Sequence, residues 1–458
     1  MLTSQEPLSL LVDFYELAMA QSYFRHRIKT QATFDLFVRR LPKNRAFLVL
    51  AGVADVLRYL RNLKFDQHSL DYLERLGFQE DFLTHLGKLR FHGDVWAMPE
   101  GAVFFANEPV LRLTGALIEL QIAESFCLNA INFSTMIATK AARIVEAARG
   151  RDVYDFSLRR THGIDAALKA ARSSALAGFS GTSNVLASKL YGIRAVGTMA
   201  HSFVMSFSSE AESFKAFFET FPDKCILLVD TYDTAEGIRN AIRIARDFKA
   251  RGHVLKGIRL DSGDLCLLSK IARKLLDTAG FKETKILASG DLDEYKIELL
   301  MQKRAPIDAF GVGTKMGVSA DAPSLDVIYK ISEVSNSDGV FFPVMKLSRG
   351  KASLPGRKQV FRIFDKNGFF EKDIIGLESE RLGVPLLKQV VRAGEPVSRQ
   401  SPLEAIRKDV AANLGCLKRP YKVLRHGAVY PVQVSPRLKK LMQGLATELK
   451  TRQVLKKP

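Results

Sequence analysis

The chain has 458 residues, of which 47% are hydrophobic and 26% are charged, so it can bury a substantial core and we expect two domains rather than one. Acidic Asp13 and Glu16 interrupt the apolar N-terminal run, so we expect neither a membrane span nor a signal peptide but a cytoplasmic protein. The net charge is +19, but Lys and Arg are spread over polar helix faces, so nucleic-acid binding is only a distant alternative.

The first part of the chain mixes helices with short strands. Apolar residues at helical spacing predict helices over 8–23, 53–90 and 113–139, the last continuing through 140–148. Short apolar runs predict strands at 33–38, 46–50, 94–98 and 102–105. Pro99-Glu100-Gly101 joins the last two and is typical of a turn. This part therefore includes a short antiparallel component.

After residue 150 apolar runs alternate with helical segments such as 234–251 and 264–279. Such alternation is typical of a parallel sheet. Polar clusters that follow neighbouring runs favour a barrel over an open sheet. The expected strands are 153–156, 177–179, 195–198, 226–229, 254–258, 286–288 and 309–311.

The alternation fades after residue 330. There we expect strands at 340–347, 360–364 and 429–434, loops at 349–351 and 355–358, and a basic amphipathic tail at 437–457. Since the N-terminal part is also mixed, both chain ends are expected to form one domain. The predicted fold class is α/β: an incomplete, TIM-like parallel α/β barrel at 126–330, with a flanking α+β domain built from 1–125 and 331–458.

Five apolar runs end in polar or glycine-rich clusters, at 197–202, 230–233, 259–264, 289–291 and 311–315. The strands of a parallel barrel carry their chemistry at their C-terminal ends, so one rim would gather these clusters. We interpret that rim as an active site. Its candidate catalytic residues are His201, Asp230, Arg259 and Asp261.

The residue types at this rim suit a phosphorylated sugar. Arg259 has the fork geometry that binds a phosphate or carboxylate with two hydrogen bonds. Asp230 and Asp233 could bind Mg²⁺ or ribose hydroxyls, or could simply cap a helix, whereas for Asp261 the functional interpretation leads. A lone histidine is most often structural, but His201 at a rim is a candidate nucleophile or phosphate partner.

Glycine-containing turns are candidate phosphate sites. The turn at 178–184 precedes a helix, so its backbone N–H groups could hold an anion or the turn could be a plain helix cap; both interpretations stay open. Gly290-Asp291 and Gly313-Thr314 follow late strands, where a glycine permits close approach of backbone to phosphate.

Eight short segments occur in a specific order: 13–15, 107–109, 137–143, 159–163, 181–187, 197–202, 259–264 and 311–314. In this order the chain resembles the nicotinate phosphoribosyltransferase family over nearly its whole length. The resemblance implies the incomplete barrel and flanking domain, and a homodimer with sites at the subunit interface. It implies a reaction that joins nicotinate to 5-phosphoribosyl 1-pyrophosphate, giving nicotinate mononucleotide and pyrophosphate in NAD salvage.

The resemblance also implies ATP as a co-substrate, with its hydrolysis coupled to the reaction through a phosphorylated His201. Mg²⁺ is expected to stabilise the departing pyrophosphate. At the base end, Phe156 would stack on the pyridine ring, and Tyr15 of the partner subunit would cover the other face. Arg159 and Arg259 would meet the pyrophosphate or the nicotinate carboxylate.

At the sugar end, the resemblance implies that Asp261 holds the ribose hydroxyls. Asp230 and Asp233 would orient His201 or a metal-bound water. The other implied substrate-binding residues are Thr182, Ser183, Ser202, Gly290, Asp291, Gly313 and Thr314. Neither a nucleic acid nor a membrane is an expected partner.

Ser183 bears on the choice of base. Relatives that use the amide resemble this chain but carry an Asp where Ser183 aligns. An Asp there accepts a hydrogen bond from an amide but repels a carboxylate. Ser183 therefore favours nicotinate, and a nicotinamide or quinolinate phosphoribosyltransferase is the alternative.

Overall fold

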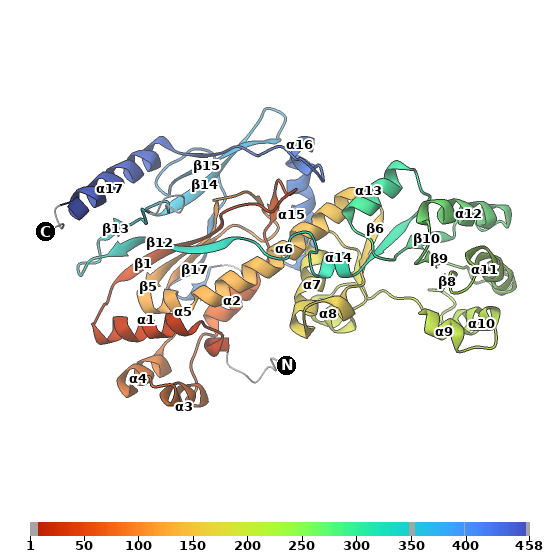
Figure 1. Cartoon of the computed structure of the whole chain (residues 1–458), viewed down its shortest axis with the longest axis horizontal. Helices are drawn as coiled ribbons and strands as arrows, with labels where there is room; N and C mark the ends of the chain where they lie inside the picture. Colours follow the sequence, from red (N-terminus) through yellow and green to blue (C-terminus); the bar gives the residue numbers. More distant parts are fainter. Residues whose placement is uncertain (1–7, 348–352, 398, 455–458) are drawn as a thin grey trace. The chain divides into compact units, whose positions relative to one another are not determined.

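The computed structural model describes residues 8–347, 353–397 and 399–454; the expected loop at 349–351 lies outside them. The chain forms two compact units (Figure 1). One comprises Lys140–Pro323, and the other combines Met1–Thr139 with Ser324–Pro458. In the described part of the chain, no helix is long and apolar enough to cross a membrane.

The unit at 140–323 is a curled, wholly parallel six-stranded sheet in the order β7-β6-β11-β10-β9-β8. Its strands are β6 (Asp152–Asp155), β7 (Gly181–Thr182), β8 (Ile226–Leu228), β9 (Gly257–Leu260), β10 (Lys285–Ala288) and β11 (Ala309–Val312). Its helices are η2 (Leu158–Arg160), α7 (Ile164–Leu176), α8 (Val185–Tyr191), α9 (His201–Met205), α10 (Glu210–Thr220), α11 (Thr234–Lys249), α12 (Leu265–Thr278), α13 (Glu294–Gln302) and α14 (Thr314–Gly317). The predicted incomplete barrel is confirmed.

Local sequence explains the strand–helix alternation. All four residues of β11 are buried, which is typical of a strand covered on both faces. Helix α11 begins where the Asp233 side chain accepts a hydrogen bond from the Glu236 N–H. Its buried residues recur at helical spacing and pack inward: Ile238, Ala241, Ile242, Ala245 and Phe248.

Two predicted strands of this unit are wrong. Residues 177–179 form the turn after α7, because Gly178 has φ +114° and reverses the chain. Phe179 is apolar because it packs in the core, where it is 1% exposed, and not because it belongs to a strand. Residues 195–198 contribute only an isolated bridge between Ala195 and Thr182.

The other unit is an α+β domain built from both chain ends. Its described strands form sheets in the orders β13-β12-β1-β5-β3-β17-β18, β16-β14-β15-β19 and β2-β4. The bounds are β1 (Gln31–Val38), β2 (Leu48–Val49), β3 (Asp94–Ala97), β4 (Val103–Phe104), β5 (Pro109–Ala116), β12 (Val327–Ser335), β13 (Phe341–Pro343), β14 (Lys358–Phe364), β15 (Phe370–Leu377), β16 (Val384–Pro385), β17 (Lys388–Arg392), β18 (Glu395–Pro396) and β19 (Val432–Val434).

The helices of this unit come from both segments of the chain that form it. They are η1 (Leu8–Leu10), α1 (Phe14–Arg25), α2 (Val53–Arg61), α3 (Gln67–Arg75), α4 (Glu80–Lys88), α5 (Leu117–Ile122), α15 (Leu403–Cys416), α16 (Arg419–Lys422) and α17 (Pro436–Val454). Helix α6 (Glu124–Ala148) continues from this unit into the barrel unit and spans the predicted limit at 125/126. Strand β12 spans the predicted limit at 330/331.

Three expectations for this unit need correction. Residues 113–116 belong to strand β5 and not to a helix, because β5 is paired on both edges and buried, so its apolar run shows no clear period. The runs at 94–98 and 102–105 enter different sheets, since β3 pairs with β5 and β4 pairs with β2. The first helix begins at Phe14 rather than at residue 8.

Candidate functional site

The parallel strands bring five predicted residues to one edge of the barrel sheet. Because β6, β8, β9, β10 and β11 run in the same direction, the residues that follow them emerge at the same end. These residues are Phe156, Asp230, Asp261, Gly290 and Gly313. The rim expected from the sequence therefore exists as a set of neighbouring strand ends.

Arg259, on β9, forms hydrogen bonds with three other side chains of this rim, and we call this arrangement the Arg259 hub. Its Nε donates to Ser289 Oγ at 2.8 Å, its Nη1 to Thr198 Oγ1 at 3.1 Å, and its Nη2 to Asp261 Oδ1 at 2.6 Å. Nη1 also lies 3.3 Å from the Met199 carbonyl oxygen. The guanidinium thus ties the segment before His201 to two strand ends, so much of its donor capacity is used inside the protein.

The Asp261 carboxylate stays ionised beside this arginine. Burial raises its pKa, but hydrogen bonds from Ser289 and Arg259, together with the charges of Arg259 and His201, outweigh burial and leave the pKa below its ordinary value. Ser289 Oγ donates to the same carboxylate oxygen that Arg259 binds. The other oxygen, Oδ2, faces His201 Nε2 at 4.0 Å. Asp261 is therefore a preorganised hydrogen-bond acceptor.

Asp230 shapes the turn that carries Asp261. Its Oδ2 accepts hydrogen bonds from the backbone N–H groups of Asp261 and Ser262 and from Ser262 Oγ, each at 2.8 Å. Asp233 caps α11. Thr231 and Asp261 lie beside the His201 ring. The implied role of Asp230 and Asp233 in orienting His201 or a metal-bound water stays a prediction.

His201 is the first residue of α9. Its Nδ1 is 3.1 Å from Thr231 Oγ1, and its side chain is 39% exposed, so the ring is both oriented and accessible. Ser202 is the next residue and is exposed. An oriented and accessible imidazole of this kind can act as a nucleophile.

Phe156 lies against β11 and Arg259. A Cβ on Gly311 would lie 2.4 Å from Phe156 Cε2, so only glycine leaves room for the ring. The Arg259 guanidinium lies 5.7 Å from the ring centroid, within cation–π range. Arg159, on the short η2 turn after β6, is exposed. The structure thus places an aromatic ring beside the Arg259 hub.

The 181–184 turn is built around Asp155. Thr182 Oγ1 donates to Asp155 Oδ2 at 2.7 Å and accepts from the Asn184 N–H at 3.1 Å. Burial raises the pKa of Asp155, opposed by hydrogen bonds from Ser157 and Thr182. Asn184 caps α8 by accepting from the Ala187 N–H, so the helix-cap interpretation of this turn is confirmed. Ser183, whose N–H bonds the Asp155 carbonyl, is only partly buried.

The Gly290–Asp291 turn has two lysines that sequence reasoning did not assign to the site. Lys296 Nζ donates to the Asp291 carbonyl at 2.8 Å and to its carboxylate at 3.0 Å, and Lys315 Nζ lies 3.8 Å from the same carboxylate. Gly313 immediately precedes α14, which begins at Thr314. Lys315 could have been found from the sequence, because it directly follows the Gly313-Thr314 turn. Nothing in the sequence except its charge pointed to Lys296.

Tyr15 lies on α1 in the unit built from both chain ends, and its side chain is 50% exposed. Beside it, Ser125 Oγ donates to Asp13 at 2.7 Å and to Glu16 at 2.9 Å. Burial raises the pKa of Glu16 to about 7, opposed by the hydrogen bond from Ser125. The ring is thus presented next to a group of carboxylates.

The raised pKa of Glu16 predicts a pH-dependent stability. The folded protein binds a proton at Glu16 more tightly than the unfolded chain does, because the pKa is higher in the folded state. The protonated carboxyl therefore adds to the free energy of unfolding. This contribution is complete below about pH 4.5 and is lost as the pH rises through about 7. Glu16→Gln should remove this part of the pH dependence. Urea unfolding at several pH values between 4.5 and 8 measures it. An identical pH dependence in the variant and the parent would contradict the assignment.

No group of three or more His, Cys, Asp or Glu side chains among the described residues could cage a metal ion. At the strand ends, Asp230 Oδ1 is buried without a hydrogen-bond partner, and Asp261 Oδ2 faces His201. Such a donor set fits Mg²⁺ only when substrate phosphates supply most of its ligands, which is its usual mode.

Comparison with known proteins decides the family. Models of the nicotinate phosphoribosyltransferase N-terminal domain, family and C-terminal domain match residues 10–132, 152–351 and 382–442. The chain belongs to the nicotinate phosphoribosyltransferase family. A family member from Mycobacterium tuberculosis is 46% identical over 434 residues, covering 94% of this chain and 92% of its own. One from Bacillus subtilis is 44% identical over 383 residues, covering 82% and 78%.

Solved structures agree with this placement in the nicotinate phosphoribosyltransferase family. The crystal structure of human nicotinic acid phosphoribosyltransferase superposes with a TM-score of 0.85 at 27% identity, covering 94% of this chain and 99% of that one. A nicotinate-nucleotide pyrophosphorylase from Pyrococcus furiosus gives a TM-score of 0.73 at 27% identity, covering 91% and 98%. The barrel and flanking domain are thus those of a known architecture.

Proposed function

We propose that this enzyme joins nicotinate to 5-phosphoribosyl 1-pyrophosphate, releasing nicotinate mononucleotide and pyrophosphate. The observation that carries the proposal is the cluster of Arg259, Asp261 and Phe156 at the C-terminal ends of the barrel strands, in a chain of this family. An aromatic ring, a cation and an ionised carboxylate there match the pyridine ring, the anionic end and the ribose of these substrates. A cytoplasmic location stays a prediction from the sequence.

The chemistry requires orientation and charge stabilisation more than a base. The pyridine nitrogen carries a lone pair and attacks the anomeric carbon as the C–O bond to pyrophosphate breaks, so the ribose gains oxocarbenium character. Asp261 Oδ2 would bind ribose hydroxyls, and Phe156 would hold the ring in line. Tyr15 of the partner subunit would cover the opposite face of the ring in a homodimer, for which its exposure leaves it available.

The anionic groups have matching cations. Lys296 and Lys315 beside Asp291, with the Gly290 and Gly313 turns, would bind the 5′-phosphate. Arg159, which is exposed, would reach the pyrophosphate or the nicotinate carboxylate. Thr182 acts through Asp155, so it would position Ser183 rather than touch substrate. Thr314 and Ser202 complete the proposed binding set.

Mg²⁺ would enter with the pyrophosphate. Its ligands from the protein would be carboxylate oxygens of Asp261 and Asp230. Its chemistry there is to neutralise the charge of the departing anion. Asp233 caps α11 through Oδ1, and its role as a further metal ligand stays a prediction.

ATP hydrolysis would be coupled through His201. A ring nitrogen attacks the γ-phosphorus, ADP leaves, and a phosphohistidine forms that water later cleaves to inorganic phosphate. The phosphoryl group would add negative charge beside Asp261 and so change the binding of pyrophosphate. His201→Ala should keep the transfer reaction but lose its stimulation by ATP and the acid-labile label from γ-³²P-ATP. Stimulation that survives in His201→Ala would contradict the coupling.

Ser183→Asp should invert the preference for the base. A carboxylate there repels nicotinate and accepts from the amide of nicotinamide, so we expect the ratio of the two kcat/KM values to move toward nicotinamide by about 100-fold. Steady-state rates with each base measure the ratio. An unchanged ratio would remove Ser183 from the specificity site.

The test of the proposed function is release of pyrophosphate by the purified chain. It should require both nicotinate and phosphoribosyl pyrophosphate, and Asp261→Asn should reduce kcat/KM by at least about 100-fold, whereas the exposed Asp338→Asn should leave it unchanged. Release that depends on quinolinate or nicotinamide instead would support the alternative members of this enzyme class.

A further inference from the structure

The unit built from both chain ends contains a cavity of about 1210 Å³ that no step of the proposed reaction uses. It is formed by α2, the turn at Pro99 and Glu100, strand β17 and the segment that leads into α15. All of its lining residues belong to this unit. Its volume is above the range of about 300–1,000 Å³ that is usual for small-molecule sites.

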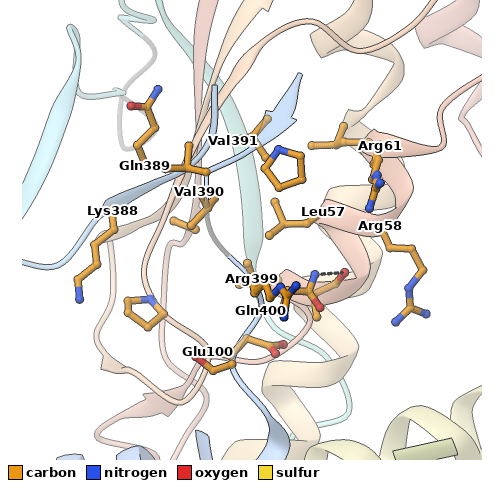
Figure 2. Close-up of a pocket in the computed structure, with 18 of the residues that line it drawn as sticks. Leu57, Arg58, Arg61, Glu100, Lys388, Gln389, Val390, Val391, Arg399 and Gln400 are labelled. Carbon is orange, nitrogen blue, oxygen red and sulfur yellow. Dashed lines mark hydrogen bonds between the residues drawn. The ribbon is translucent and has the colours of Figure 1, made fainter. Parts of the chain in front are cut away.

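The floor of this cavity is apolar and its edge is cationic. Leu57, Val390 and Val391 lie between Lys388 on one side and Arg58 and Arg61 on the other in Figure 2. Arg399 is the fourth cation, contributed by the segment before α15. The remaining apolar lining includes Val53, Leu60, Phe91, Met98, Val397 and Ile406.

The charges of the cavity are unbalanced. Four basic side chains line it against two acidic ones, Glu100 and Asp409. Glu100 already accepts a hydrogen bond from the Gly52 N–H at 2.7 Å. Across the described ranges of the chain, Arg61, Lys388 and Arg399 form no ion pair. Three cations with exposed heads therefore surround an apolar floor without acidic partners.

The backbone at the cavity is irregular where a regular strand would be expected. Strand β17 pairs with β3 through Gln389–Trp96 and then Val391–Val95, so Val390 is an extra residue in a β-bulge. A bulge redirects side chains, and bulges occur preferentially beside functional sites. Gly394, with φ +83°, also lines the cavity, and a Cβ there would lie 2.4 Å from the Phe91 carbonyl oxygen. The wall is thus shaped by a bulge in β17 and by the tight turn that follows this strand.

We propose that this cavity is a binding site for an amphipathic anion, a small molecule with a flat or apolar body and a phosphate, sulfonate or carboxylate head. The body lies on Leu57, Val390 and Val391, and the head meets Arg61 and Arg399. Apolar burial and charge-assisted hydrogen bonds act on different parts of the same ligand, so neither an inorganic anion nor a neutral apolar molecule satisfies the site.

The experiment is a fluorescence titration of the full chain with 1-anilinonaphthalene-8-sulfonate, beside N-phenyl-1-naphthylamine, which has the same rings without the sulfonate. The sulfonate should bind saturably, and Arg61→Ala/Arg399→Ala should weaken it at least tenfold. The matched control Arg75→Ala/Arg437→Ala removes two exposed arginines of the same unit outside the cavity and should change nothing. The neutral probe should bind at least tenfold more weakly than the sulfonate to the parent protein.

A second variant protects the test against misfolding. Leu57→Trp fills the floor and leaves every charge in place, so it should also weaken sulfonate binding, while far-UV and near-UV circular dichroism confirm the fold. The proposal is overturned by equal affinity for the two probes, by sulfonate binding that neither cavity variant changes, or by equal losses in the control. Pyrophosphate release by these variants should match the parent, and failure of the proposed function would leave the binding result intact.

Discussion

Replacing Gly290 with alanine should reduce the rate of phosphoribosyl transfer by at least about 100-fold and lower the free energy of unfolding by about 4 kcal/mol or more. A Cβ at this position would lie 1.9 Å from the Asp261 carbonyl oxygen, and Gly290 has φ +97°. The contact is with backbone, so no side-chain rotation relieves it. Either the β10 turn or the Asp261 turn must move, and a displacement near 1 Å at a catalytic group reduces rates by about 100-fold.

Gly280→Ala is the matched control for that substitution. Gly280 also has a positive φ, +83°, in the same unit, but a Cβ there meets nothing within 4 Å. It should cost only the backbone strain of about 1–2 kcal/mol and leave kcat/KM unchanged. Urea unfolding and steady-state kinetics on both variants separate strain from clash. Similar losses in the two variants would refute the claim that contact between the β9 and β10 turns shapes the site.

Arg259→Lys should reduce kcat/KM by about 1000-fold although the charge is retained. The arginine binds Ser289, Thr198 and Asp261 through three different nitrogens. A lysine supplies one nitrogen at one point, so it cannot hold the segment before His201 and the Asp261 carboxylate together. We expect the loss mainly in kcat, because the groups that Arg259 positions act in the transition state.

Arg273→Lys provides the comparison for Arg259. Arg273 also uses three nitrogens, to Asp277, Thr284 and Phe281, but it lies on α12 beside the start of β10, at the opposite end of that strand from the site. It should lower stability slightly and leave kcat/KM as in the parent. If Arg259→Lys keeps its activity, the hub does not organise the site; if Arg273→Lys is equally inactive, loss of packing explains both results.

Sequence reasoning located the rim because β6, β8, β9, β10 and β11 each show a local apolar run followed by a polar turn, whereas β7 does not. Asp233 and Asp264 each follow a strand and cap the next helix, so strand, turn and helix can be read in order. The same local signal left the role of such acids open, and the structure assigns Asp233 and Asp264 to capping. By contrast, Asp230 bonds a turn 31 and 32 residues away, which no local pattern encodes.

What local sequence could not show follows the same physics. The expectation that Arg259 faces an anion stays a prediction, and its contacts with Ser289 and Thr198 cross 30 and 61 residues of chain and form only when strands pair. Residues 113–116 at the end of β5 were read as helix because a strand buried on both faces has no alternation to detect. Gly290 was predicted for its freedom near phosphate, whereas the structure adds a steric reason, its contact with Asp261.

One comparison tests the central claim most directly: product formation by the purified enzyme with nicotinate, nicotinamide and quinolinate, each with phosphoribosyl pyrophosphate and with or without ATP. The proposed site predicts nicotinate mononucleotide as the main product, a rate increase with ATP, and little product from the other two bases. Faster turnover of nicotinamide or quinolinate than of nicotinate, or no product from any of the three, would contradict it.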